Sequence, residues 1–207
     1  IVAMLAEGLT PRRIVTETAI RNAIAVVMAL GGSTNSALHL PAIAHEAGMR
    51  VGLDVFDEIS HTTPHLCDIK PSGRYAVSAL RDAGGVPAVM KELASKLDLD
   101  ALTVTGKPWR HELEGVVNLN PEVIRPLSDP IHAQGSIAIL RGNLAPEGAV
   151  VKQTGVKDKM LVHAGPAKVF HSMEEAVEAV INERITHGDV VVVRYEGPKG
   201  GPGMQEM

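Results

Sequence analysis

In the first half of the chain, apolar residues recur at helical spacing. Thr10 and Pro11 form a suitable helix start, and the run that follows becomes apolar on nearly every side before Gly31 and Gly32 end it. This pattern predicts a buried helix over residues 11–30. Further helices are predicted at residues 36–47, 54–60, 74–82 and 86–97, with a short strand at residues 51–53. Such alternation is typical of an α/β fold.

The second half of the chain has a different pattern. Short β-rich runs between Gly, Pro, Asn and Asp turns predict strands at residues 136–140, 149–152, 160–163 and 190–195. One helix is predicted at residues 172–184, where Ser172 is a suitable cap. We therefore divide the chain into an α/β domain, residues 1–110, and a β-barrel or sandwich domain, residues 111–207.

The composition narrows the class of protein. The 207 residues are 45% hydrophobic and 21% charged, which is typical of a folded globular protein. A net charge of -4 and only 2% aromatic residues provide no basic or stacking surface, so we expect no nucleic-acid partner. The longest apolar stretch, residues 23–30, is too short to cross a bilayer, so we expect no membrane partner. A single cysteine, Cys67, excludes an internal disulfide and favours a reducing, cytoplasmic compartment.

Residues 31–35, Gly-Gly-Ser-Thr-Asn, form a corner between two predicted helices. Backbone N–H groups at a helix N-terminus, with the hydroxyls of Ser33 and Thr34 and the amide of Asn35, are suited to bind a carboxylate or phosphate. The same residue types are also preferred as ordinary helix caps. On the motif alone, a self-capped corner is favoured over a binding site.

A second group of polar residues contains metal-ligand atoms. His61, His65, Cys67 and Asp68 fall within eight residues but lack a paired ligand spacing, so we expect no zinc site. Cys67 follows the apolar residue Leu66, so we expect its thiol to be packed in the interior and not to act as a nucleophile.

The end of the chain joins a predicted strand to a loop rich in glycine and proline. Glycine permits backbone conformations closed to other residues and proline fixes φ, so such a loop is able to approach a ligand in one stiff shape. Of the acids Asp189, Glu196 and Glu206, only Glu206 is displayed by the loop itself, and carboxylates are ligands that Mg2+ selects. The alternative is that Glu206 is a solvated loop residue that binds no metal. The glycines around Lys199 do not have the spacing of a P-loop, so we expect no phosphate-binding role for this lysine.

Several longer stretches point to one known family. They are GGSTNSALHLPAIAHEAG (31–48), PHLCDIKPSGRY (64–75), DAGGVPAVMKEL (82–93), LTVTGK (102–107), VIRPLSDPI (123–131), AILRGNLAPEGAVVK (138–152) and VVVVRYEGPKGGPGMQEM (190–207). In this order they resemble the dihydroxy-acid/6-phosphogluconate dehydratase family, and most closely its dihydroxy-acid dehydratases, the iron-sulfur hydro-lyases of valine and isoleucine biosynthesis. The resemblance covers nearly the whole chain.

The resemblance implies the end of an N-terminal α/β domain followed by the start of a C-terminal β-barrel domain of the swivelling type, and so an internal segment of a longer protein. It implies dehydration of 2,3-dihydroxy-3-methyl carboxylic acids with Mg2+ and an iron-sulfur cluster, [2Fe-2S] or [4Fe-4S], as Lewis acids. Glu206 matches the glutamate ending the family's GPGM-x-E motif and would be a Mg2+ ligand, while Gln205 stands where many relatives have proline. The cluster ligands, a carbamylated lysine and a serine base would lie outside this segment, and Cys67 matches no cluster ligand.

The resemblance also raises Ser33, Thr34 and Asn35 to possible substrate-binding residues. It implies a homodimer whose ligand is a small dihydroxy acid. Two alternatives stay open: a sugar-acid dehydratase of the same superfamily, acting on an aldonate or 6-phosphogluconate, and a non-catalytic carboxylate-binding relic. Residues 68–75 and 140–152 fit the branched-chain enzyme better than the sugar-acid enzymes.

Overall fold

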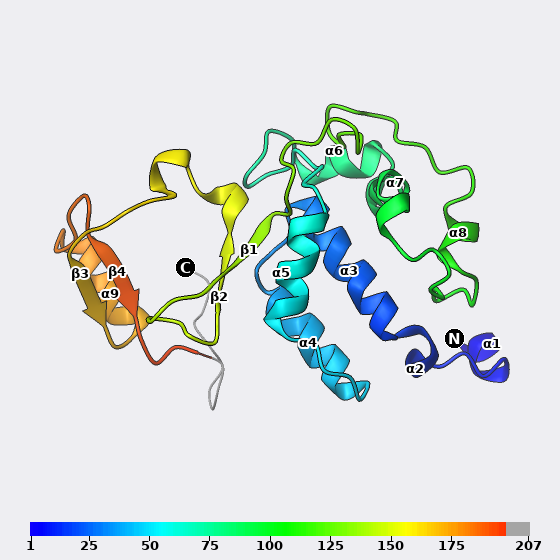
Figure 1. Ribbon diagram of the computed structural model, residues 1–207, viewed down its shortest axis with the longest axis horizontal. Coiled ribbons are helices and arrows are strands. Elements are labelled where there is room, and N and C mark those ends of the chain that lie inside the picture. Colours follow the sequence, from blue (N-terminus) through cyan, green and yellow to red (C-terminus); the bar gives the residue numbers. More distant parts are fainter. Residues whose placement is uncertain (198–207) are drawn as a thin grey trace. The chain divides into compact units, whose positions relative to one another are not determined.

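The computed structural model describes residues 1–197, and the chain divides into two compact units, Ile1–Val156 and Lys157–Met207. The first unit contains eight α-helices and the hairpin of β1 and β2 within its described residues (Figure 1). The described part of the second unit contains β3, β4 and the helix α9 (Figure 1).

The first unit is built around α3 (Glu17–Leu30). The Oγ1 of Thr16 caps this helix by accepting the N–H of Ala19 at 3.2 Å, and Gly31 ends it in the left-handed conformation at φ 72°. The helix is apolar on most of its surface, and its buried residues are Ile20, Asn22, Ile24, Ala25, Val26, Met28 and Ala29. α3 therefore forms the centre of the hydrophobic core.

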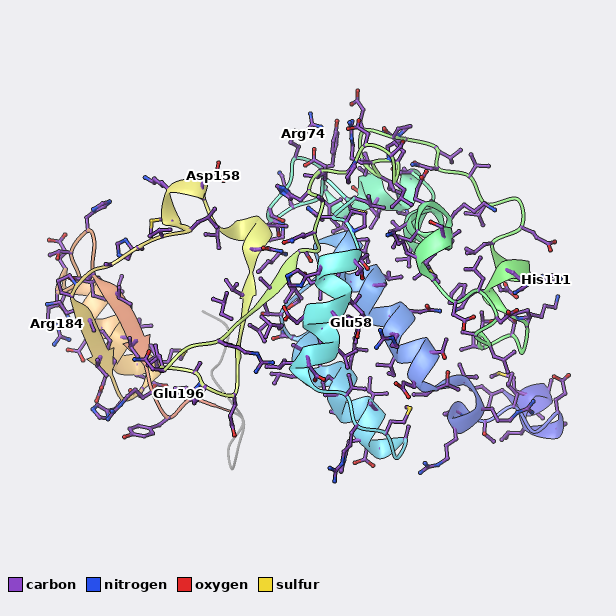
Figure 2. The ribbon with its side chains drawn as sticks, viewed as in Figure 1. Glu58, Arg74, His111, Asp158, Arg184 and Glu196 are labelled. Carbon is purple, nitrogen blue, oxygen red and sulfur yellow. The ribbon has the colours of Figure 1, made fainter. Side chains whose placement is uncertain are left out.

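Three helices pack against α3. They are α4 (Ser36–Glu46), α5 (Leu53–Thr62) and α7 (Gly85–Glu92). An ion pair between Arg21 and Glu58 joins α3 to α5 at the surface. Figure 2 labels Glu58 on α5. The other elements are short: α1 (Val2–Ala6), α2 (Pro11–Ile14), α6 (Val77–Asp82), α8 (Trp109–Glu112), and the 3-10 turns η1 (Ala94–Lys96) and η2 (Gln153–Gly155).

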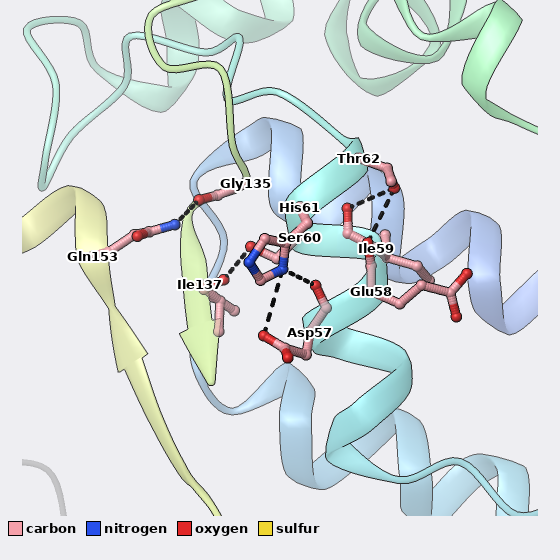
Figure 3. Close-up of polar contacts among 9 residues, drawn as sticks. All are labelled: Asp57, Glu58, Ile59, Ser60, His61, Thr62, Gly135, Ile137 and Gln153. Carbon is pink, nitrogen blue, oxygen red and sulfur yellow. Dashed lines mark hydrogen bonds and ion pairs between the residues drawn. The ribbon is translucent and has the colours of Figure 1, made fainter. Parts of the chain in front are cut away.

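The hairpin of β1 (Ile137–Leu140) and β2 (Ala149–Lys152) is fixed to the helices at its base. The strands are antiparallel, and β1 packs on α5. The Oγ of Ser60 on α5 donates a hydrogen bond to the carbonyl of Ile137 at 2.5 Å (Figure 3). The Nε2 of Gln153, just after β2, donates to the carbonyl of Gly135 at 2.5 Å (Figure 3). Both strands are thus fixed where they enter and leave the core.

The carbonyl groups at the end of α3 are bound by segments distant in sequence. Such groups have no partner inside their own helix and need donors from elsewhere. The carbonyl of Ala29 accepts the N–H groups of Leu66 at 2.9 Å and Cys67 at 3.1 Å. The carbonyl of Met28 accepts the N–H of Ser136 at 3.1 Å. The segment after α5 and the segment before β1 therefore meet at one helix end.

The second unit pairs two strands through a helix. Its described elements are η3 (Asp158–Met160), β3 (Ala167–Phe170), α9 (Met173–Ile181) and β4 (Val190–Val193). β3 and β4 are parallel, and α9 lies between them in the chain, as a parallel pair requires of its connection. The Oγ of Ser172 caps α9 by accepting the N–H of Glu175 at 3.2 Å.

Most of the predicted elements are confirmed to within a few residues, among them the helices at residues 36–47 and 172–184 and three of the strands. The predicted strand at residues 51–53 is wrong, because Leu53 begins α5 with Asp54 in its first turn. The strand at residues 160–163 is also wrong, because Met160 ends the 3-10 turn η3 and residues 161–163 form no strand. The predicted helix 11–30 is broken into α2 and α3.

Helices and strands occur in both units, in agreement with the mixed α/β class. Within residues 1–197 the strands form two two-stranded sheets and no closed barrel. The swivelling-type β-barrel and the domain boundary after residue 110 therefore stay predictions. In this part of the chain no helix is both long enough and apolar enough to span a membrane.

The buried amide of Asn22 gives the first testable prediction. Its Nδ2 donates to the carbonyl of Asp98 at 2.8 Å, and its Oδ1 accepts the N–H of Asp98 at 3.0 Å. We expect Asn22→Ala to lower the free energy of unfolding by about 2 kcal/mol, because both backbone groups of Asp98 lose their partner. The exposed Asn120 provides the control, and Asn120→Ala is expected to cost less than about 1 kcal/mol. Urea denaturation of the full-length protein measures both; equal losses would contradict the prediction.

Candidate functional site

Residues 31–35 form the α3–α4 corner, a tight connection between the end of one helix and the start of the next. The Oγ of Ser33 accepts the N–H of Asn35 at 3.2 Å. The Oγ of Ser36 donates to the carbonyl of Ser33 at 2.8 Å. Ser33 therefore stabilises the turn itself, whereas Asn35, the N-cap residue of α4, makes no side-chain capping hydrogen bond with the residues that the structure describes.

The corner nevertheless keeps several polar groups free. Ser33 and Asn35 are exposed and Thr34 is half-buried. Among the described residues, no hydrogen-bond partner exists for the N–H groups of Ser33 and Thr34 or for the side chains of Thr34 and Asn35. These groups lie at the N-terminus of the 11-residue helix α4, where the helix dipole favours negative charge. The three predicted substrate-binding residues thus form one turn with unused donors.

His65 lies directly against this corner. Its side chain is buried, and neither ring nitrogen has a partner within the described part of the chain. A Cβ added to Gly31 would lie 2.8 Å from the Nε2 of His65, so the ring touches the backbone of the corner. Leaving a buried polar atom unpaired costs about 1–3 kcal/mol. The sequence pattern around His65 suggested only metal-ligand chemistry and gave no sign of this position beside Gly31.

The imidazole of His65 is neutral at neutral pH. Burial, together with the neighbouring His132 and Lys152, lowers the pKa of His65 to about 4. The rings of His65 and His132 stack with their centroids 5.5 Å apart and their planes 11° from parallel. A neutral ring has one donor nitrogen and one acceptor nitrogen, so His65 offers one of each.

Lys152 reaches the corner from the end of β2. Its Nζ donates to the carbonyl of Gly31 at 2.7 Å, which places a cation at the C-terminal end of α3. Partial burial lowers the pKa of Lys152. The two residues are 121 positions apart in the chain, so no local sequence signal could have identified this contact.

The polar residues that precede and follow Leu66 have separate roles. His61 is bonded through its Nδ1 to the carbonyl of Asp57 at 2.7 Å (Figure 3). Burial raises the pKa of Cys67 to about 12, so its thiol stays protonated. Both carboxylate oxygens of Asp68 accept hydrogen bonds from Arg74, which lower the pKa of that carboxyl against the opposing effect of burial.

The acids near the end of the chain also differ in their roles. The Oε1 of Glu196 accepts the N–H of Met173 at 2.9 Å, at the start of α9. The Oδ2 of Asp189 accepts hydrogen bonds from the N–H and the Oγ1 of Thr186, and the backbone bond lowers the pKa of Asp189. Glu206, the predicted Mg2+ ligand, lies outside the described residues, as does Lys199. Residues 1–197 contain no group of three or more side chains placed to hold a metal ion.

Two protein-family models match the chain in sequence order. The first is described as "Dihydroxy-acid/6-phosphogluconate dehydratase N-terminal" and matches residues 1–112. The second is described as "Dihydroxy-acid/6-phosphogluconate dehydratase C-terminal" and matches residues 122–207. The resemblance seen in the seven sequence stretches is therefore confirmed.

Individual relatives cover the whole chain. Proteins named dihydroxy-acid dehydratase are 54% identical in Methanococcoides burtonii, 53% identical in Halothermothrix orenii and 55% identical in Desulfosudis oleivorans. Each of these comparisons covers 100% of this chain and 38% of the relative. The chain therefore spans less than half the length of the curated relatives that it matches.

The contact between Gly31 and His65 gives a second prediction. Gly31→Ala is expected to destabilise the protein by the cost of a left-handed alanine, about 1 kcal/mol, and by the clash of the new Cβ with the His65 ring. Gly48 is a matched control, because its φ is +83° and nothing lies within 4 Å of a Cβ built there.

We expect the loss of unfolding free energy in urea to be at least about 1 kcal/mol larger for Gly31→Ala than for Gly48→Ala. A His65→Ala background should remove that excess. An excess that persists without the ring would show that the ring is not what excludes a side chain at Gly31.

Proposed function

The chain belongs to the dihydroxy-acid/6-phosphogluconate dehydratase family, and we propose that it is part of a dihydroxy-acid dehydratase. The observation that carries this proposal is the identity of about 54% to proteins of that name along the whole chain. The full-length protein would remove water from 2,3-dihydroxy-3-methyl carboxylic acids in valine and isoleucine biosynthesis. The C2 proton and the C3 hydroxyl leave as water, and the resulting enol becomes a 2-keto acid.

The α3–α4 corner would bind the substrate. Ser33 and Thr34 supply two backbone N–H groups without partners among residues 1–197, and the side chains of Thr34 and Asn35 supply a hydroxyl and an amide. Groups of this kind bind the oxygens of an acid and hold it in one orientation. These donors support a substrate-binding role, because the side chains that stabilise the turn are those of Ser33 and Ser36.

Of the two implied cofactors, Mg2+ would have a ligand in this chain and the iron-sulfur cluster would not. Glu206 would supply one hard oxygen ligand to Mg2+, and a bound Mg2+ would polarise the substrate and favour loss of its C2 proton. Cys67 does not fit a ligand of the iron-sulfur cluster, [2Fe-2S] or [4Fe-4S], because it is buried and protonated. The cluster would be held by other parts of the full-length protein. A cytoplasmic homodimer stays a prediction.

The proposal is tested by assaying the full-length protein, loaded with its cofactors, on 2,3-dihydroxy-3-methylbutanoate, gluconate and 6-phosphogluconate. We expect turnover of the branched dihydroxy acid in preference to both sugar acids. Preference for a sugar acid would assign the protein to the other branch of the family. Absence of turnover with all three would favour a non-catalytic relic.

The Glu206 assignment has its own test. We expect Glu206→Gln to lower kcat/KM at least about 100-fold and to raise the Mg2+ concentration needed for half-maximal activity. Glu174 is exposed at the start of α9, and Glu174→Gln is expected to leave both quantities unchanged. An unchanged Mg2+ requirement in Glu206→Gln would remove Glu206 from the metal site.

A further inference from the structure

Lys152 is a cation without an acidic partner in the described part of the chain. Its Nζ donates one hydrogen bond to the carbonyl of Gly31. Its other two N–H groups have no partner among residues 1–197. No ion pair among residues 1–197 includes it, although seven pairs form elsewhere. A partly buried ammonium group is stabilised by a nearby negative charge, and within residues 1–197 only the carbonyl end of α3 supplies any, as a partial charge.

His65 is a second group that lacks a partner at the same place. It is only 4% exposed, and both of its ring nitrogens are buried without a hydrogen bond in the described residues. The ring edge is directed at Gly31, the residue whose carbonyl holds Lys152. Buried polar atoms in folded proteins are almost always paired, so the ring nitrogens of His65 need a polar partner that residues 1–197 do not supply.

The free groups around the corner have one electrostatic character. Lys152 is cationic, and the N–H groups of Ser33 and Thr34 lie at the positive end of the α4 dipole. The acid nearest to His65 in the chain is Asp68, and Arg74 already binds both of its oxygens. Donors and positive charge therefore outnumber acceptors at the corner, which favours an anion over a cation or a neutral group.

From this juxtaposition we propose that Lys152 and His65 complete an anion site at the α3–α4 corner, and that the anion is the carboxylate of the small hydroxy acid. The inference rests on the proposed function, since that function makes an acid the ligand. Lys152 would balance the negative charge, and the N–H groups of the corner and His65 would bond the carboxylate oxygens. Neither Lys152 nor His65 was assigned a role by its sequence pattern.

A purely structural role for Lys152 is the competing explanation. A lysine near the C-terminal end of α3 stabilises the helix through its dipole and its bond to Gly31, whether or not a ligand binds. The two explanations differ in one respect. An anion site distinguishes a carboxylate from a neutral amide of the same shape, whereas a structural cap affects the binding of both equally.

The experiment compares two probes, 3-methyl-2-oxobutanoate and 3-methyl-2-oxobutanamide. Their dissociation constants are measured by titration calorimetry on the full-length protein with its cofactors, in the wild type and in Lys152→Met. We expect Lys152→Met to weaken binding of the acid by about tenfold to a hundredfold and to leave the amide unchanged, because a charge-assisted hydrogen bond is lost. Lys152→Arg should restore part of the affinity for the acid.

Two further variants provide a control for Lys152 and a separate test of His65. Lys91 also donates to a backbone carbonyl, that of Leu113 at 3.2 Å, so Lys91→Met is the matched control and should change neither constant. His65→Phe keeps a flat ring and removes its nitrogens, and we expect it to weaken binding of the acid by about fivefold or more.

The possible results distinguish failure of the anion site from failure of the proposed function. If the wild type binds the acid and Lys152→Met weakens acid and amide equally, or neither, Lys152 is a structural cap and the anion site is wrong. If the wild type does not bind the acid at all, the proposed function and the anion site are both overturned. An acid-to-amide preference that is lost in Lys152→Met, reduced in His65→Phe and kept in Lys91→Met supports both.

Discussion

The hydrogen bonds to the last carbonyl groups of α3 are the interaction on which the first unit depends. A helix end buried in a core needs donors from outside, because its own final carbonyls have none within the helix. The donors come from the segment after α5, from the segment before β1, and from the side chain of Lys152 at the end of β2. Three parts of the chain that are far apart in sequence are thereby brought to one place.

The same interaction determines the shape of the candidate site. Gly31 has to adopt a left-handed conformation and to leave space for the ring of His65, so only glycine satisfies both demands. The carbonyl of Gly31 then faces Lys152, and the chain continues directly into the N-terminus of α4. The end of α3 thus holds the cation of Lys152, and the turn that leads into α4 presents N–H groups without partners among residues 1–197.

The sequence predicted the parts of this arrangement that depend on local signals. The pair of glycines and the Ser-Thr-Asn turn marked the corner and identified Ser33, Thr34 and Asn35, because caps and helix ends are set by neighbouring residues. Their proposed role in substrate binding came from a family resemblance and is still to be tested. Lys152 and His65 could not be predicted, since their importance arises from contacts made only after the chain folds.

The wrong predictions have a similar origin. Residues 51–53 are too few and too mixed to show a period, and the helix cap at Gly52 decided the outcome. The strand β3 was missed because Ala167 and its neighbours form a strand only by pairing with β4, 23 residues further along the chain. Pairing of this kind is a property of the folded unit and leaves little trace in a window of ten residues.

The most direct test of this account is a crystal structure of the full-length protein with 3-methyl-2-oxobutanoate bound. The account predicts a carboxylate oxygen within hydrogen-bond distance of the Nζ of Lys152 and of an N–H of Ser33 or Thr34. A carboxylate bound elsewhere, with only water at the α3–α4 corner, would contradict it and leave the corner as a structural connection between two helices.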